Sequence, residues 1–122
     1  MLMNDSDFIY KKLIVWQKAM LFWRLVYHQV RLFPPEERYA LSDQVRRAAV
    51  SVPSNIAEGA GRSSAKDYAH FLAIARGSLF ETMTQLEGAE MLEYIKVPQE
   101  LIDVAAETGR MLTAMLKKYE AI

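Results

Sequence analysis

The polar face along residues 42–62 is the stretch of this sequence best suited to bind a ligand. Its polar side chains recur at steps of mostly three or four residues, which places them on one side of a helix: Gln44, Arg47, Ser51, Ser54, Asn55 and Glu58, with Arg46 adjacent. Guanidinium and ammonium groups on such a face bind phosphates. We therefore predict a nucleic-acid-binding surface formed by Arg46, Arg47, Arg62, Lys66 and Arg76.

The same stretch also allows a structural interpretation. Pro53 has no backbone N–H, so it leaves the Ala49 carbonyl without its helical partner and should kink the helix. Asn55 and the serines could satisfy carbonyls freed in this way, while Arg47 could pair with an acid across a subunit boundary. We favour this interpretation, but the sequence leaves both open. The structural motif comprises Pro53, Asn55, Glu58 and Gly59.

Metal chemistry has little support. Glu87, Glu90 and Glu93 recur every three residues and could hold a hard cation, but a solvated acidic helix face is the more common meaning of that spacing. His28 and His70 lie on different predicted helices, and no Glu-x-x-His pair is present. We predict no metal site and no cofactor.

Catalysis has no better support. Gly59, Gly61 and Arg62 lack the lysine and the preceding strand of a phosphate-binding loop. The serines of residues 51–64 have no histidine near them in the sequence that would activate a hydroxyl. We therefore predict that the protein is not an enzyme.

Charge is balanced overall but divided unevenly along the chain. Fifteen Lys and Arg face fifteen Asp and Glu, so the formal net charge is zero. Residues 1–76 carry a net charge of +4 and residues 77–122 a net charge of −4. Such a dipolar molecule can steer an acidic partner to one side, or use its two signs in contacts between subunits.

Composition predicts a single domain spanning residues 1–122. The length suffices for a core without disulfides, and there is no cysteine to form one. No apolar run approaches the ~18 residues of a spanning helix, and the N-terminal MLMNDSDF has no basic lead typical of a secretory signal. We expect a cytoplasmic protein with no membrane partner.

Periodicity predicts helices over about residues 7–32, 42–60, 64–94 and 98–120. Ser6 or Asp7, Ser42 and Ser64 are the expected N-caps, and Pro98 should occupy the first turn of the last helix. An interior Gly77 indicates close approach of another helix. Because the connections are short, we predict an all-α, antiparallel up-down-up-down four-helix bundle whose second helix is kinked near Pro53.

The first predicted helix is apolar on several sides. A heptad seam contains Ile9, Leu13, Trp16, Met20, Trp23, Tyr27 and Val30. A second stripe contains Val15, Ala19, Phe22, Val26 and Phe33, and a third contains Ile14, Leu21, Leu25 and Leu32. One bundle needs only one broad apolar face per helix, so the surplus predicts a subunit interface. We assign this interface to Ile14, Leu21, Phe22, Leu25 and Leu32.

A series of short motifs runs through the first three predicted helices. It begins with Val15-Trp16-Gln17-Lys18-Ala19, Phe33-Pro34, Tyr39-x-Leu41 and Gln44-x-Arg46-Arg47-Ala48. It continues with Ser51-Val52-Pro53-x-Asn55-Ile56-Ala57-Glu58-Gly59, Gly61-Arg62, Phe71, Ala75-Arg76-Gly77-Ser78-Leu79 and Glu81. These motifs closely resemble the bacterial four-helix-bundle family encoded in intervening sequences of 23S rRNA genes, and the likeness covers residues 13 to about 94.

The resemblance implies a four-helix bundle that assembles into a homopentamer without established enzymatic activity. A related protein, the accessory variability determinant of diversity-generating retroelements, is a similar pentamer that binds a reverse transcriptase and nucleic acid. That protein is strongly basic, whereas this chain is neutral. We therefore expect a non-enzymatic, oligomeric scaffold or adaptor associated with structured RNA or a ribonucleoprotein. The alternative is a pure protein-interaction module, such as an accessory subunit for a reverse transcriptase or another nucleic-acid-processing protein.

Overall fold

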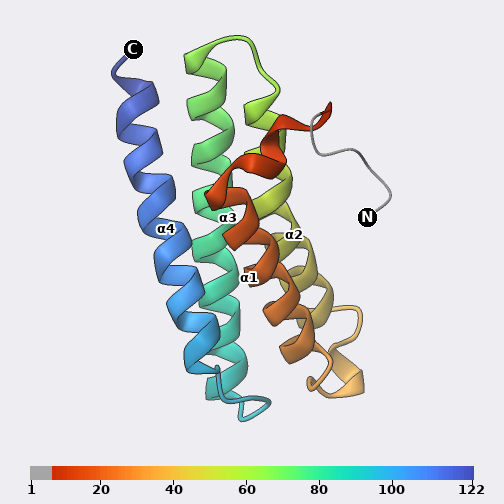
Figure 1. The fold of residues 1–122 in the computed structure, drawn as a ribbon. Coiled ribbons are helices and arrows are strands. Elements are labelled where there is room, and N and C mark those ends of the chain that lie inside the picture. Colours follow the sequence, from red (N-terminus) through yellow and green to blue (C-terminus); the bar gives the residue numbers. More distant parts are fainter. Residues whose placement is uncertain (1–6) are drawn as a thin grey trace.

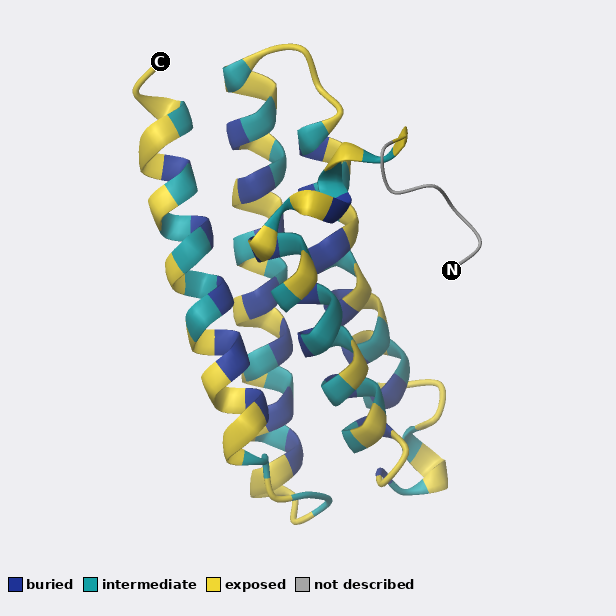
Figure 2. Cartoon of the chain, viewed as in Figure 1, coloured by how far each residue is buried: buried dark blue, intermediate teal, exposed yellow. Residues whose placement is uncertain are grey.

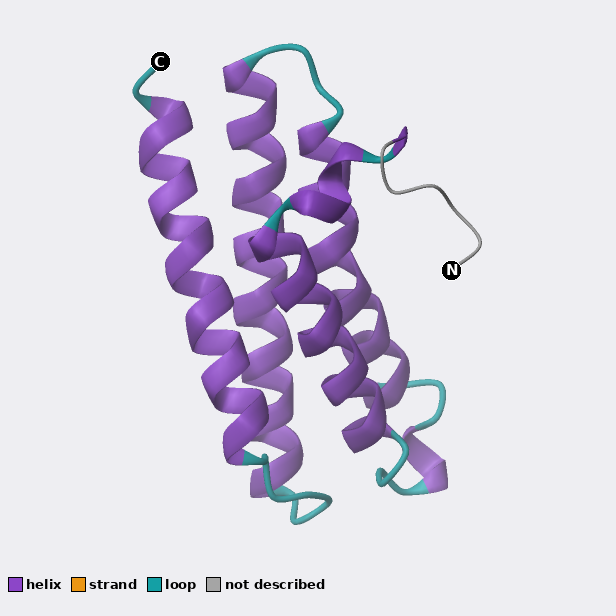
Figure 3. Ribbon diagram, viewed as in Figure 1, coloured by secondary structure: helices purple, strands orange, loops and turns teal. Residues whose placement is uncertain are grey.

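The computed structural model describes residues 7–122, and every regular element in that range is helical (Figure 3). In chain order, the elements are η2 (Ile9–Lys12), α1 (Ile14–Val30), η3 (Pro35–Glu37), α2 (Leu41–Ala60), α3 (Ala65–Met91) and α4 (Gln99–Glu120). The prediction of an all-α protein with four principal helices is confirmed. Within the described residues, no helix combines the length and the apolar character that are needed to cross a bilayer.

The four principal helices lie side by side with their long axes roughly aligned (Figure 1). α1 packs against α2 and α4, and α3 packs against the same two helices. Successive helices run in opposite directions, and short connections join them (Figure 1). The start of α1, the end of α2, the start of α3 and the end of α4 therefore meet at one end of the bundle.

The core is formed by one stripe from each helix (Figure 2). On α2, Val45, Ala49, Val52 and Ile56 recur at steps of four, three and four, and all four are fully buried. On α3 the stripe from Leu72 to Ala89 is also buried. The largest fully buried side chains are Phe22, Ile56, Leu72, Leu79, Leu86, Leu101 and Leu112.

The predicted start of the first helix is wrong. α1 begins at Ile14 rather than near Asp7. Leu13 has extended backbone angles (φ −76°, ψ 122°), which separate α1 from the short helix η2. The Gln17 side chain donates a 2.8 Å hydrogen bond to the Lys11 carbonyl across this break. The break also places Tyr10 against Trp16, with ring centroids 5.1 Å apart. Ser6, the other predicted cap, lies outside the described residues.

The buried face of α1 is the second predicted stripe, not the heptad seam. Val15, Ala19, Phe22 and Val26 are buried in the core. Most of the seam, including both tryptophans, is only partly buried and lies at the margin of the core. Spacing alone could not distinguish the two stripes, because both are apolar and both satisfy helical periodicity.

One predicted helix cap is present in the structure, and some other predicted helix ends differ from the observed ones. Ser64 caps α3 as predicted, because its hydroxyl accepts a 3.1 Å hydrogen bond from the Asp67 backbone N–H. Ser42 does not cap α2; it is a buried residue inside the first turn. α3 ends at Met91 because Glu93 turns the chain with a positive φ of 64°. Pro98 lies one residue before α4.

Two glycines show where the helices approach closely. A Cβ atom on Gly59 would lie 2.9 Å from Phe71 Cβ and 2.9 Å from Tyr68 Cδ1, so α2 and α3 need a glycine at their junction. Gly77 behaves differently from the prediction, because a Cβ there would meet nothing within 4 Å in this chain. Close packing inside the bundle therefore explains Gly59 but not Gly77.

These two sites make a matched pair for alanine substitution. Gly59→Ala should lower the free energy of unfolding by about 1–3 kcal/mol, because the Phe71 Cβ is fixed to its backbone and cannot move aside. Gly77→Ala should raise it by about 0.5–1 kcal/mol through helix propensity. Urea unfolding at one protein concentration measures both values. Equal shifts of the same sign would contradict this assignment of Gly59.

Candidate functional site

The predicted structural motif on α2 is part of a hydrogen-bond network between two helices. Asn55 Nδ2 donates to the Ser51 carbonyl at 2.7 Å and to Ser51 Oγ at 2.8 Å. Ser78 Oγ on α3 also donates to Ser51 Oγ at 2.8 Å. The carbonyl that accepts the hydrogen bond from the Asn55 amide is that of Ser51. It is not the Ala49 carbonyl, which lacks its helical partner because Pro53 has no backbone N–H. This network fixes the register of α2 against α3.

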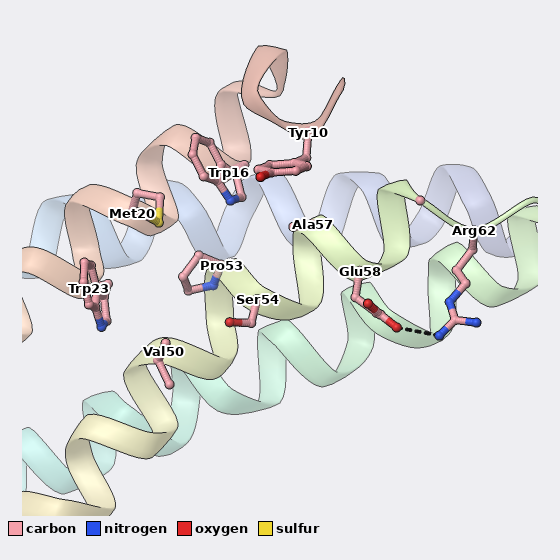
Figure 4. Close-up of a pocket in the computed structure, with 11 residues that line it drawn as sticks. Tyr10, Trp16, Met20, Trp23, Val50, Pro53, Ser54, Ala57, Glu58 and Arg62 are labelled. Carbon is pink, nitrogen blue, oxygen red and sulfur yellow. Dashed lines mark hydrogen bonds and ion pairs between the residues drawn. The ribbon is translucent and has the colours of Figure 1, made fainter. Parts of the chain in front are cut away.

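Pro53 itself lies inside α2, which continues from Leu41 to Ala60 without interruption. Its ring is buried and faces the first helix across a groove (Figure 4). Glu58 belongs to a surface ion pair with Arg62, four residues further along the chain. The members of the predicted motif therefore serve three different contacts: the α2–α3 network, the groove and the surface.

Each predicted phosphate-binding side chain on α2 has a contact within the chain. Arg47 Nε pairs with Asp43 Oδ2 at 3.0 Å, so within this chain its acid lies on its own helix. Arg46 donates to the Arg38 carbonyl at 3.3 Å. These contacts are at least partly exposed and leave the guanidinium groups accessible to solvent.

The other three predicted cations lie elsewhere. Arg62 pairs with Glu58 and lies over the Phe71 ring, 4.7 Å from its centroid. Lys66 is exposed in the first turn of α3. Arg76 is partly buried and reaches Thr113 on α4, with 3.4 Å between Nη1 and Oγ1.

These five cations do not form one surface. α2 contains 20 residues and is about 30 Å long. Arg46 and Arg47 lie near its start, whereas Arg62 and Lys66 follow its end, at the opposite end of the bundle. The sequence grouped them because it shows order along the chain and not the length of the helix between them.

An open groove lies between η2 and α1 on one side and α2 on the other (Figure 4). Its volume is about 760 Å³. One wall consists of aromatic and sulfur-containing side chains, and the other is the outer face of α2. The lining residues are Tyr10, Trp16, Met20, Trp23, Val50, Pro53, Ser54, Ala57, Glu58, Gly61 and Arg62.

Sequence reasoning missed this groove as a site. Trp16, Met20 and Trp23 follow each other at steps of four and three, a signal that was read as the core seam. Because the second stripe fills the core instead, these side chains lie between α1 and α2 and remain partly exposed. The Trp23 indole N–H is buried and makes no hydrogen bond within the described residues.

Two tyrosines have raised pKa values, each with a local cause. Partial burial raises the pKa of Tyr68, and the adjacent Tyr119 adds to the effect. The ring centroids of Tyr68 on α3 and Tyr119 on α4 lie 4.5 Å apart. The hydrogen bond that Tyr94 donates to Glu37 Oε2, at 2.9 Å, raises the pKa of Tyr94. Both tyrosines connect elements of the bundle.

The candidate cation ligands of α3 do not converge. Glu90 Oε1 accepts a 2.8 Å hydrogen bond from the Val97 backbone N–H and so holds the connection to α4. Across residues 7–122, no group of three or more His, Asp or Glu side chains is arranged to hold a metal ion. His28 and His70 are exposed on different helices.

The predicted interface residues divide into three groups. Ile14 and Leu32 have 60% and 63% of their surface exposed, so they are available to a partner. Leu21 and Leu25 are partly buried against the core. The assignment of Phe22 is wrong, because this side chain is fully buried inside its own bundle and has no surface to offer.

The fold and these contacts define a four-helix bundle with an inter-helical polar network and an aromatic groove. The model of a family described as 23S rRNA-intervening sequence protein matches residues 11–114. The chain belongs to this family. A search of curated proteins gave no match.

The polar network gives a direct test of its structural role. Ser51→Ala removes the hydroxyl that accepts from both Asn55 and Ser78, so it should lower the free energy of unfolding by about 1–2 kcal/mol. Ser54→Ala, on the exposed side of the same helix, is the control and should change it by less than about 0.5 kcal/mol. Chemical denaturation measures both. Similar losses in the two variants would mean that the network does not stabilise the bundle.

Proposed function

We propose that this protein is a non-enzymatic, homo-oligomeric helical scaffold that associates with RNA in the cytoplasm. The observation that carries the proposal is the apolar surface that a single bundle leaves uncovered. Ile14 and Leu32 are exposed at the two ends of α1, and Leu21 and Leu25 lie partly exposed between them on the same stripe. This stripe lies at the edge of the core, which the Val15–Val26 stripe of the same helix already fills, so one bundle covers only part of it.

Association gains free energy by covering this stripe. Each Å² of apolar surface removed from water contributes roughly 25 cal/mol. Exposed apolar residues that follow one side of a helix mark an interaction site more strongly than scattered ones do. A second copy of the chain is the partner that is always present at a matching concentration.

A closed ring of five copies is the assembly that we propose, in agreement with the pentamer implied by the family resemblance.

Association with RNA is supported by the family to which the chain belongs and by the many exposed cations on the surface. The RNA would be bound mainly through its phosphates, because these surface cations are lysines and arginines without a built pocket for a base. No catalytic step is part of the proposed role. The scaffold would instead hold RNA, or a protein bound to RNA, in a fixed arrangement around the ring.

The groove favours a second candidate function. Its aromatic wall and open shape suit an amphipathic helix of a protein partner better than a phosphate chain. In that case the protein would be a pure interaction module, such as an accessory subunit for a reverse transcriptase or another nucleic-acid-processing protein. RNA would then be contacted by the partner and not by this chain.

Mass measurement tests the oligomer. Multi-angle light scattering at micromolar concentration should give about five times the mass of one chain, because the apolar stripe is covered in a closed ring. Ile14→Glu combined with Leu25→Glu should shift the protein toward monomers, since each places a charge on the stripe. Tyr39→Glu, at a more exposed position in a connection, is the control and should leave the mass unchanged. A monomeric wild type would contradict the scaffold.

RNA binding is tested separately with the unmodified protein. A labelled, structured RNA should be retarded in a gel or show increased fluorescence anisotropy at low salt. Its affinity should fall steeply as salt increases, because phosphate contacts release counterions. If the protein is oligomeric but the RNA remains free even at low salt, the pure protein-interaction module is the correct function.

A further inference from the structure

The fold converts the charge division along the sequence into a charge division along the bundle axis. The Ser51–Ser78 hydrogen bond lies at the middle of α2 and α3 and divides the described chain into two halves. We call residues 7–17, 52–77 and 110–122 the basic end. Its charged residues are the cations Lys11, Lys12, Arg62, Lys66, Arg76, Arg110, Lys117 and Lys118, and the acids Asp7, Glu58, Asp67 and Glu120. The basic end thus carries a net charge of +4.

The remaining part of the described chain, residues 18–51 and 78–109, has the opposite sign. Its acids are Glu36, Glu37, Asp43, Glu81, Glu87, Glu90, Glu93, Glu100, Asp103 and Glu107. Its cations are Lys18, Arg24, Arg31, Arg38, Arg46, Arg47 and Lys96, which leaves a net charge of −3. Arg46 and Arg47 therefore lie in the acidic half of the bundle, and Arg47 is additionally paired with Asp43.

We infer that RNA contacts the basic end of the bundle, and that Arg46 and Arg47 are not part of this contact. The inference rests on the proposed association with RNA and names the surface that carries it. Most of the cations at this end are exposed: Lys12, Arg62, Lys66, Arg110, Lys117 and Lys118. Lys12 belongs to η2, Arg62 to the α2–α3 connection and Lys66 to the first turn of α3. Arg110 lies at the middle of α4, and Lys117 and Lys118 lie in its last turn. The start of α1, the α2–α3 connection and the end of α4 meet at one end of the bundle (Figure 1).

Aromatic rings hold several of these cations in place. Arg62 lies over Phe71, and Lys118 Nζ lies 5.4 Å from the ring centroid of Tyr119. Tyr119 in turn packs on Tyr68, two residues after Lys66. The rings thus connect the end of α4 to the start of α3. Ordered cations lose less side-chain entropy when they bind phosphates than freely moving ones do.

A net charge of zero does not weaken this contact. The centres of the two halves are separated by roughly half the length of α2, about 15 Å. Salt screens charges beyond a Debye length of about 8 Å at physiological ionic strength. An RNA phosphate at the basic end is therefore attracted by the nearby cations and only weakly repelled by the distant acids. At the other end the same phosphate would be repelled.

Two double substitutions of equal charge test the location. Lys66→Glu with Lys117→Glu changes the basic end, and Arg46→Glu with Arg47→Glu makes the same change in the acidic half. Lys66 and Lys117 are exposed, so their replacement should preserve the fold. Anisotropy titration of a labelled RNA hairpin at low salt should show about tenfold weaker binding for the first variant and less than about twofold for the second. Circular dichroism and light scattering establish that both remain folded and assembled.

The outcomes separate this inference from the proposed function. Equal weakening by both variants, or greater weakening by the Arg46 and Arg47 variant, would overturn the basic end as the RNA contact while leaving RNA association intact. Failure of the wild type to bind RNA would overturn the association itself. The last measurement is a titration of the protein with vesicles containing anionic phospholipid in the same buffer. Binding to vesicles but not to RNA would assign the basic end to a lipid surface instead.

Discussion

The close packing of α2 against α3 is the constraint on which the rest of the structure depends. At one end, Gly59 permits an approach that a single Cβ atom would obstruct. At the middle, Ser51 accepts from Ser78 and ties the two helices at a fixed register. Because polar groups buried between helices must be paired, a shift of one helix along the other would cost these hydrogen bonds as well as apolar contacts. α1 and α4 then pack on the two sides of a pair that is already fixed.

The packing of the core determines which apolar side chains of α1 remain at the surface. One stripe of α1 fills the core, so the tryptophans are left beside α2 and the third stripe is left at the edge of the core, with Ile14 and Leu32 exposed. The aromatic groove and the apolar stripe are therefore consequences of the same choice of buried face. A helix that is apolar on several sides has more apolar surface than one bundle covers, and the surplus stays in contact with solvent. The two surfaces are distinct, so an oligomer could form while the groove stays open to another protein.

Much of the fold could be predicted from the sequence, because helix number and type depend on local periodicity. The α2 stripe and the Ser64 cap are set by neighbouring residues, and both agree with the structure. The buried face of α1 could not be predicted, since three apolar stripes satisfy the same spacing and only the other helices select one. The break at Leu13 was also hidden, because neither a proline nor a glycine marks it in the sequence. For the site, the sequence favoured a structural role for Asn55 and the serines, but it could not show that Ser51 is the partner of Asn55 or that Ser78 completes their network.

Charge shows most clearly why position in the fold matters more than position in the chain. The charges of the whole chain sum to zero. The two parts of the sequence have opposite net charges, but the sequence does not show where these charges lie in space. An antiparallel bundle brings the end of α2 and the end of α4 together with the starts of α1 and α3, so cations distant in the sequence become neighbours. The helix dipoles add little there, because two N-termini and two C-termini meet at the same end and largely offset each other. In a cyclic ring every copy points the same way along the axis, so the cations of all copies would lie on one rim. Assembly would then multiply a modest charge into a surface that a long polyanion can contact at many points.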